Sequence, residues 1–175
     1  MKINDIDVRN YPSSEKVYIH GKLHDIDVPM RRIDLTPTVK IVNGEKLTRH
    51  NDPVYVYDTS GVYTDPSVTV DINRGIPRTR EKWIAAREDL EQLPAITSEY
   101  GRQREADKSL DSIRFAHRYA PRRAKEGCAV TQMALARQGV ITPEMEYVAI
   151  RENLNNEALG IHSDITPEMV REEVA

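Results

Sequence analysis

Four stretches of this sequence contain residue types that are able to carry chemistry, and the first follows a strand-like segment. Asp58-Thr59-Ser60-Gly61 is similar to the Asp-Thr-Gly turn through which two carboxylates come together and share a proton. Its glycine stands one position too late, and the chain has no second copy of the turn. The stretch is therefore interpreted as a polar turn that closes the strand at residues 54–57.

Two histidines and one cysteine are the candidate metal ligands. His20 and His24 have the four-residue spacing that places two ligands on one face of a helix, but their surroundings are typical of strand and turn. No third ligand stands at a known offset, so we expect exposed histidines. Cys128 is the only cysteine, which excludes an internal disulfide and a cysteine cluster within the chain and favours a buried or inert thiol.

The stretch "RFAHRYAPRRAK", residues 114–125, interleaves basic and aromatic side chains. This mixture is typical of surfaces that hold phosphates and stack bases. A solvated face or an arginine–carboxylate interface explains it equally well on a chain with a net charge of -3. The basic and aromatic members are Arg114, Arg118, Arg122, Arg123, Lys125, Phe115 and Tyr119.

The whole sequence, 175 residues with 30% charged residues, is typical of one ordinary globular domain. No apolar run approaches the roughly 20 residues that span a bilayer, and the N-terminal residues lack the apolar region of a secretory signal. We therefore expect a cytoplasmic protein that does not bind membranes. The modest net charge gives no general attraction to nucleic acid.

The elements that must position these residues change character near residue 75. Residues 1–15 are polar and without a sustained period, which predicts a flexible leader. Short alternating segments then predict strands, and Asn43-Gly44 predicts a type I′ hairpin turn because both residues tolerate positive φ. The predicted strands lie within 16–21, 24–35, 37–47, 53–61 and 67–72.

Beyond residue 75, helical patterns replace the alternating ones. Trp83, Ala86, Leu90 and Leu93 share one face of a predicted helix over residues 79–93, which Pro94 ends. Further helices are predicted within 106–119 and within 129–138, the latter ending at Gly139 in a left-handed cap. The domain is thus predicted as α+β, β-rich over 16–75 and helical over 76–175, with about five helices on one side of a mostly antiparallel sheet.

The pentapeptide "ITPEM" occurs twice, at residues 141–145 and 165–169. A threonine cap, a proline at the first helical position and a glutamate in the first turn together favour a helix start. The residues that follow the two copies differ, so the copies predict two helix starts and not a repeat. The second helix has few apolar residues to bury, so we expect it to be only marginally stable.

Four segments carry a resemblance to a known family over residues 16–175. They are "PVYVYDTSGVYTDP", "WIAAREDLEQL", "VTQMALARQGVITPEMEYVAIREN" and "ITPEMVREEVA". Together they resemble the N-terminal part of phosphomethylpyrimidine synthase, a radical S-adenosylmethionine enzyme of thiamine biosynthesis. Val62 stands where the family commonly has proline, and Ala134-Leu135 replace bulkier or polar aromatic side chains; both are interpreted as packing changes.

The resemblance implies a lyase that rearranges aminoimidazole ribotide into hydroxymethylpyrimidine phosphate. It implies a homodimer with a (βα)8 barrel, a C-terminal domain, a [4Fe-4S] cluster, S-adenosylmethionine and a divalent metal such as zinc. This chain is similar only to the portion before the barrel, so no catalytic, substrate-binding or metal residue is assigned to it. The expectation is a scaffold or interface domain that does not catalyse by itself; the alternative is an anion- or nucleic-acid-binding module that uses Arg114 to Lys125.

Overall fold

The computed structural model describes residues 11–115 and 118–175. Three antiparallel strands form the central sheet, in the order β1 (Ser14–His20), β2 (Asp27–Ile33) and β5 (Val54–Tyr57). The polar leader predicted for residues 1–15 lies mostly outside the described residues, and Ser14 and Glu15 are part of β1. The α+β prediction, with short antiparallel strands followed by helices, is confirmed.

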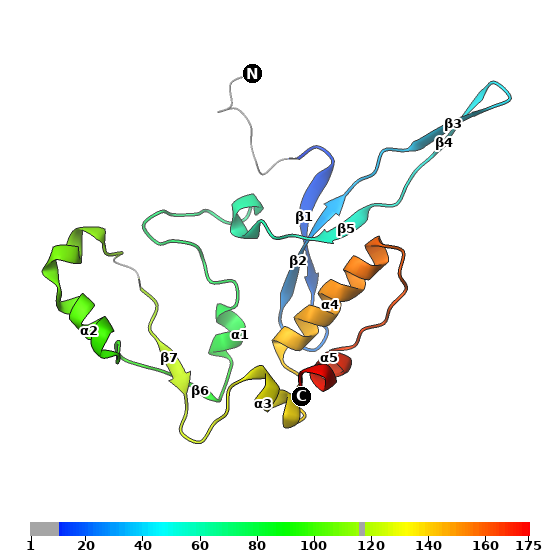
Figure 1. Cartoon of the computed structure of the whole chain (residues 1–175). Helices are drawn as coiled ribbons and strands as arrows, with labels where there is room; N and C mark the ends of the chain where they lie inside the picture. Colours follow the sequence, from blue (N-terminus) through cyan, green and yellow to red (C-terminus); the bar gives the residue numbers. More distant parts are fainter. Residues whose placement is uncertain (1–10, 116–117) are drawn as a thin grey trace.

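One hairpin projects away from the sheet and is here called the arm (Figure 1). It consists of β3 (Thr38–Val42) and β4 (Glu45–Arg49), which pair antiparallel with Val42 opposite Glu45. Asn43 and Gly44 have φ values of 54° and 85°, as a two-residue type I′ turn requires. The predicted hairpin turn is therefore confirmed.

A long helix covers one face of the sheet. Helix α4 (Pro143–Ala158) packs on β5 and β2. The short helix α5 (Pro167–Val174) packs on α4, and the short helix α3 (Gln132–Arg137) packs on α5 (Figure 1). The buried apolar side chains of the described chain belong almost entirely to this body: Ile26, Val28, Met30, Val62, Ala136, Met145 and Ala149. The burial of Val62 agrees with a packing role for this departure from the family pattern.

The "ITPEM" segments do start helices, as predicted. Thr142 and Thr166 each accept a hydrogen bond from the backbone N–H three residues later, and each is followed by proline at the first helical position. Helix α5 is better anchored than its sequence predicts, because Arg171 donates to the Ala136 carbonyl at 2.9 Å. Helix α3 ends before Gly139, whose φ of 79° confirms the predicted left-handed cap.

The segment between the sheet and α3 differs most from the predictions. The helix predicted over 79–93 is confined to α1 (Glu81–Ala85), because Leu90–Gln92 form strand β6 and pair with β7 (Arg122–Ala124). This long-range pairing overrides the helical period of the sequence. Gly61–Thr64 form the short 3-10 helix η2, which directly follows the polar turn at Asp58.

Two further predictions in this segment were wrong. No strand forms at 67–72, because the Asp65 and Asp71 side chains accept from the N–H groups of Ser67 and Asn73, each at 2.8 Å, and thereby fix turns. The helix predicted within 106–119 is replaced by α2 (Glu99–Ala106) and the 3-10 helix η3 (Lys108–Ile113). They are separated at Asp107, whose side chain accepts from Ser109 N–H at 3.0 Å.

The described helices include none that combines the length and the hydropathy needed to cross a bilayer.

Candidate functional site

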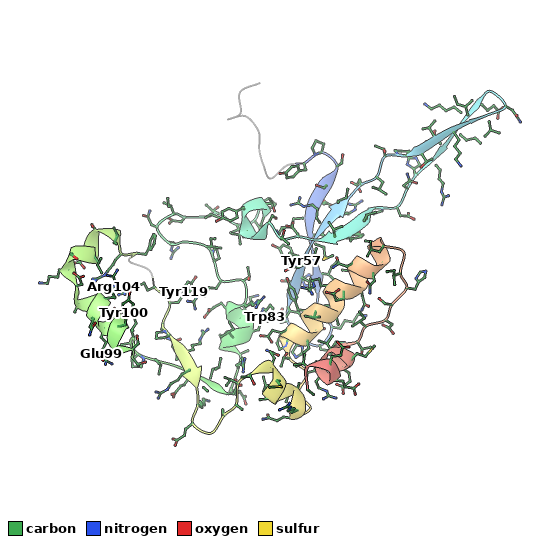
Figure 2. All side chains as sticks on the ribbon, in the orientation of Figure 1. Tyr57, Trp83, Glu99, Tyr100, Arg104 and Tyr119 are labelled. Carbon is green, nitrogen blue, oxygen red and sulfur yellow. The ribbon has the colours of Figure 1, made fainter. Side chains whose placement is uncertain are left out.

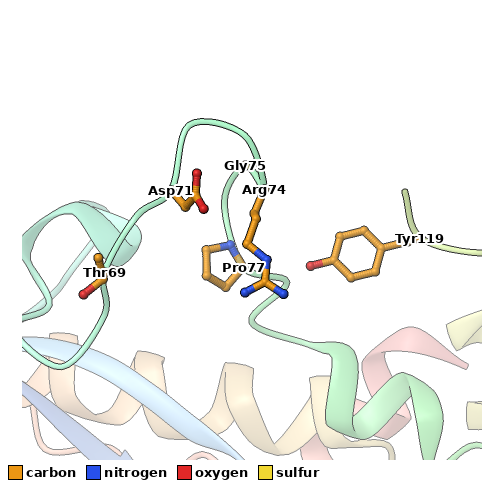
Figure 3. Close-up of a pocket in the computed structure, with 6 residues that line it drawn as sticks. All are labelled: Thr69, Asp71, Arg74, Gly75, Pro77 and Tyr119. Carbon is orange, nitrogen blue, oxygen red and sulfur yellow. The ribbon is translucent and has the colours of Figure 1, made fainter. Parts of the chain in front are cut away.

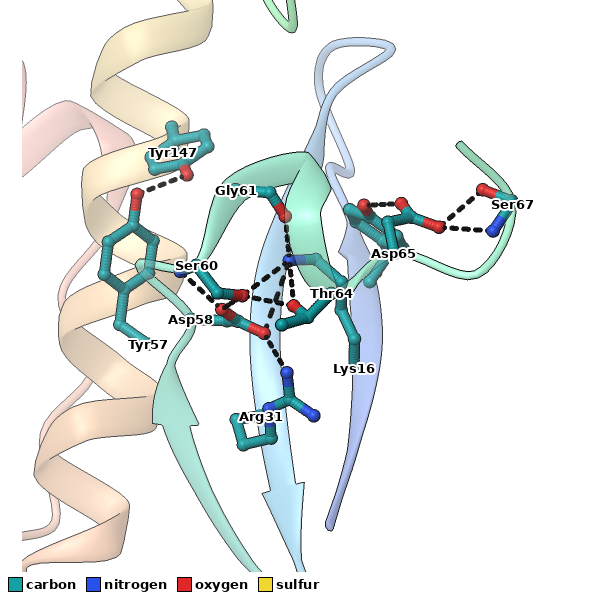
Figure 4. Close-up of polar contacts among 11 residues, drawn as sticks. Lys16, Arg31, Tyr57, Asp58, Ser60, Gly61, Thr64, Asp65, Ser67 and Tyr147 are labelled. Atoms are coloured by element: carbon teal, nitrogen blue, oxygen red, sulfur yellow. Dashed lines mark hydrogen bonds and ion pairs between the residues drawn. The ribbon is translucent and has the colours of Figure 1, made fainter. Parts of the chain in front are cut away.

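A buried charged cluster joins the three strands of the sheet (Figure 4). Asp58, directly after β5, lies 3.3 Å from the Lys16 ammonium of β1 and 3.1 Å from the Arg31 guanidinium of β2. The side chains of Lys16 and Asp58 are only 2% and 3% exposed. One carboxylate thus compensates two cations in an environment where water screens them little.

The residues after Asp58 complete the cluster. Ser60 donates its N–H to Asp58 at 2.8 Å, and its hydroxyl also donates to that carboxylate. Lys16 donates to the Gly61 carbonyl at 2.6 Å and to the Thr64 hydroxyl at 3.5 Å. Asp58-Thr59-Ser60-Gly61 is therefore the polar turn that the sequence predicts, and its carboxylate is held by cations and hydroxyls.

The Asp58 carboxyl is held in its ionised form. Burial raises its pKa, but the hydrogen bonds from Ser60 and the charge of Lys16 together lower it by more. The pKa of Asp58 therefore lies below its ordinary value. A carboxylate in this state is a poor proton donor at neutral pH. Its chemistry is that of a fixed counter-ion.

A second set of hydrogen bonds connects the sheet to the loop after η2. The Tyr18 hydroxyl donates to Asp65, which also accepts from Ser67 N–H at 2.8 Å (Figure 4). Burial, together with the Asp65 carboxylate, raises the pKa of Tyr18 well above its ordinary value. The Asp65 pKa is raised by burial but lowered more by the bonds from Ser67 and Tyr18, and lies below its ordinary value.

An aromatic group links α4, β5 and α1; Figure 2 labels its members Tyr57 and Trp83, and Figure 4 labels Tyr147. The hydroxyls of Tyr57 and Tyr147 are 2.8 Å apart, and the Trp83 ring lies 5.9 Å from that of Tyr147. Arg80 lies 5.7 Å above the Trp83 ring. Burial and the bond with Tyr57 raise the pKa of Tyr147 well above its ordinary value.

These three groups surround a cavity of about 540 Å³ between the sheet, the loop after η2 and α1. Its size lies within the range of small-molecule sites. The lining is close to charge-balanced, since Lys16, Arg78, Arg80 and Lys82 face Asp25, Asp27, Asp58, Asp65 and Glu81. The lining groups with shifted pKa are ionised carboxylates or neutral tyrosines at pH 7, so none of them is poised for proton transfer.

The sequence prediction missed a clamp between α4 and the connection from β1 to β2. Glu146, only 2% exposed, accepts from the N–H groups of Leu23 at 2.7 Å and His24 at 2.8 Å, and from Lys22 N–H. Burial raises its pKa, but these bonds and the His24 ring lower it below its ordinary value. A signal was present, because Glu146 shares the buried face of α4 with Thr142, Met145 and Ala149.

The two candidate histidines, His20 and His24, each contact a carboxylate. His20 contacts Asp27 with a side chain that is 81% exposed, as expected. His24 lies 2.8 Å from Glu146 and is only 28% exposed, so the expectation of an exposed residue was wrong there, since α4 covers it. Within residues 11–115 and 118–175, no three His, Cys, Asp or Glu side chains come together as a metal site.

The arginines of the basic stretch are also paired with carboxylates. Their partners are Asp111 for Arg114, Glu105 for Arg118, Glu81 for Arg122 and Glu91 for Arg123. Arg78 lies 3.7 Å from the centre of the Tyr119 ring and covers one of its faces. Arg118 and Arg123 are also 52% and 64% exposed, so among the described residues of this stretch the ion pairs fit both the solvated face and the arginine–carboxylate interface.

A second cavity, of about 460 Å³, lies where the loop at 69–77 faces Tyr119 (Figure 3). Asp71 and Arg74 supply its charged lining.

Cys128 is exposed, which contradicts the prediction of a buried thiol, and no group of metal ligands among the described residues includes it.

Residues 10–91 match the family model of the ThiC-associated domain. The match contains the whole central sheet, the arm, η2 and α1, and with them Lys16, Arg31 and Asp58. Glu146 and the helices that cover the sheet lie beyond the matched residues.

Proposed function

We propose that this chain, whose residues 10–91 match the ThiC-associated domain and which resembles the N-terminal part of phosphomethylpyrimidine synthase, is the scaffold domain of that lyase. The family relates it to thiamine biosynthesis. In the proposal, the complete cytoplasmic enzyme converts aminoimidazole ribotide to hydroxymethylpyrimidine phosphate. This domain supports the catalytic barrel and the C-terminal domain within a homodimer.

The observation that carries the scaffold role is the buried cluster around Asp58. Its carboxylate, its two cations and the hydroxyls of Ser60 and Thr64 bond one another, and their bonds join β1, β2, β5 and η2. Glu146 adds a second set of bonds, from α4 to the same sheet. Such networks rigidify a domain and fix the relative position of its elements.

The residues of this chain do not fit the cofactors of the reaction. A cluster that leaves one iron open for S-adenosylmethionine needs three thiolates, and the sequence supplies Cys128 alone. The described residues likewise bring together no group suited to zinc. In the proposal, the [4Fe-4S] cluster, S-adenosylmethionine and the divalent metal are therefore held by other parts of the enzyme.

The alternative of an independent anion- or nucleic-acid-binding module receives less support. Binding phosphates through Arg122 or Arg123 would first require breaking their pairs with Glu81 and Glu91. The carboxylates would then repel the incoming anion.

Gene deletion tests the assignment. We expect that removing the coding region for this chain from its natural gene creates a growth requirement that the pyrimidine moiety of thiamine satisfies and the thiazole moiety does not. The intact gene supplied on a plasmid is the control. Growth of the deletion strain without thiamine, or rescue by the thiazole moiety, would contradict the assignment.

A further inference from the structure

The scaffold function proposed above does not use the cavity of about 540 Å³ between the sheet, the loop after η2 and α1. On the sheet side of this cavity the polar groups already have partners. Lys16 lies 3.3 Å from Asp58, and the Tyr18 hydroxyl donates to Asp65. A ligand that enters the cavity therefore finds its available polar groups on the wall that residues 77–83 form.

That wall is positively charged, although the lining as a whole is close to balance. The three cations of residues 78–82 outnumber Glu81 and give this segment a net charge of +2. Glu81 is itself compensated from β7, because Arg122 donates to it. Within the described part of the chain, neither Arg80 nor Lys82 has a carboxylate partner. Two cations thus remain available at the edge of the cavity.

The same wall ends in an aromatic ring. Trp83 is only partly buried and lines the cavity. The Tyr147 ring lies 5.9 Å from it with a tilt of 33° between the planes, and the Arg80 guanidinium lies 5.7 Å from its centre. A flat apolar group gains most by packing on rings of this kind.

The two tyrosines of the cavity add a hydrogen-bond donor. Tyr57 and Tyr147 bond each other through their hydroxyls at 2.8 Å, which uses one of their two hydroxyl protons. The other proton has no acceptor among the described residues. Burial raises the pKa of Tyr147 most, and the charge of Arg80 opposes this effect, so Arg80 acts on the same place. A cation and a hydroxyl donor therefore converge beside the Trp83 ring.

These groups together restrict the ligand to one chemical class. A phosphate monoester carries roughly two negative charges at neutral pH, which matches the net charge of residues 78–82. Guanidinium groups donate paired hydrogen bonds to phosphate oxygens. An extended nucleic acid fits less well, because Asp25, Asp27 and Asp65 also line the cavity and repel further phosphates. The volume is that of a small-molecule site.

We propose that this cavity binds a small aromatic phosphate monoester, with its ring against Trp83 and its phosphate at the edge that Arg80 and Lys82 form. The site lies outside residues 114–125 and uses none of the arginines of that stretch. The proposal rests on the cavity alone and goes beyond the scaffold function, so its failure would leave the scaffold proposal unchanged.

The fluorescence of Trp83, the only tryptophan, tests the proposal in a titration of the full 175-residue chain with phenyl phosphate at constant ionic strength. We expect a saturable change, and a Kd about tenfold higher for Arg80→Ala, because a charge-assisted hydrogen bond is lost. Arg49→Ala is the matched control, since Arg49 is an exposed arginine that likewise lacks a carboxylate partner in the described chain but lies outside the cavity. A change that does not saturate, or equal Kd values for the two variants, would overturn the proposal.

Two simpler probes separate the ring from the phosphate. Inorganic phosphate keeps the charge without the ring, and benzoate keeps the ring with a single charge. Each should bind at least about tenfold more weakly than phenyl phosphate. Inorganic phosphate that binds as tightly as phenyl phosphate would overturn the role of Trp83, and equally tight benzoate would overturn the assignment of a phosphate.

Thermal unfolding followed by circular dichroism gives a measurement that does not depend on Trp83. A ligand that binds only the folded chain raises the midpoint of unfolding. One concentration of phenyl phosphate should raise this midpoint for the native chain and for Arg49→Ala, and by much less for Arg80→Ala. An equal rise in all three proteins would place the ligand elsewhere and overturn the proposal; spectra without ligand verify that each variant is folded.

Discussion

At the scale of single residues, this domain is organised by carboxylates that remain ionised although they are buried. Asp58 compensates Lys16 and Arg31, and Glu146 accepts from three consecutive backbone N–H groups. Ionised groups in such places are costly unless every bond is made. Their substitution should therefore affect stability more than the substitution of any exposed acid.

Replacing Asp58 by Asn should destabilise the fold strongly. The change leaves Lys16 and Arg31 buried beside a neutral amide, and breaking a buried ion pair typically costs about 3–5 kcal/mol. Urea titration followed by the fluorescence of Trp83, the only tryptophan, measures the effect. Asp52→Asn is the control, since Asp52 is exposed; equal losses for the two variants would show that the cluster contributes nothing specific.

The same carboxylates make stability depend on pH in acid. The pKa values of Asp58 and Glu146 in the folded protein lie below their ordinary values of 3.8 and 4.5. The unfolded chain therefore binds more protons than the folded chain in acid. The contribution of the two carboxylates to stability is fully present above their ordinary pKa values and is lost as pH falls through their pKa values in the folded protein. Urea titrations across this range should show stability falling below about pH 4.5, with a smaller slope for Glu146→Gln.

At the scale of elements, the two "ITPEM" helix starts have the same local chemistry but different surroundings. Thr142 is 4% exposed, and its hydroxyl also donates to Gln132 at 2.6 Å. Thr166 accepts from Met169 N–H at 3.2 Å in a more open position. Helix α5 is nevertheless docked, because Arg171 and Arg137 connect it to α3.

Removing the two caps should therefore destabilise the protein by unequal amounts. Thr166→Ala should cost about 1 kcal/mol, and Thr142→Ala nearer 2 kcal/mol because it also leaves Gln132 without its partner. The sequence alone predicts almost no loss at Thr166, as for a marginal terminal helix. Urea titration separates these cases, and no measurable loss for Thr166→Ala would mean that α5 contributes nothing to the folded state.

At the scale of the whole molecule, the described chain combines a small packed body with long extensions (Figure 1). The sheet and α4 contain the core, whereas α1, α2 and η3 bury no residue completely. Elements of this kind contribute little stability by themselves.

The isolated chain should hold no iron–sulfur cluster. A single thiolate, Cys128, cannot supply the three ligands that such a cluster needs. Anaerobic reconstitution with iron and sulfide, followed by desalting, should leave no stoichiometric iron and no cluster absorbance. Cys128→Ser serves as the control and should behave identically; cluster absorbance that is present in the native chain and lost in this variant would contradict the expectation.

The sequence by itself determined the features that depend on neighbouring residues. The Asn43-Gly44 turn, the caps at Thr142 and Thr166, the end of α3 at Gly139 and the polar turn at Asp58 all follow from the φ values or hydrogen bonds that each residue type favours locally. The family resemblance, too, was readable from contiguous segments.

Only the tertiary structure decided the features that join distant parts of the chain. Nothing local indicates that Leu90–Gln92 pair with Arg122–Ala124, or that Lys16 and Asp58 meet. The amphipathic period of residues 79–93 was a valid helical signal, but pairing with a distant strand outweighed the small helix propensities. The period of α4 places Glu146 on the buried face, but its donors are the distant N–H groups of Leu23 and His24, so only the tertiary structure decided its role as a clamp.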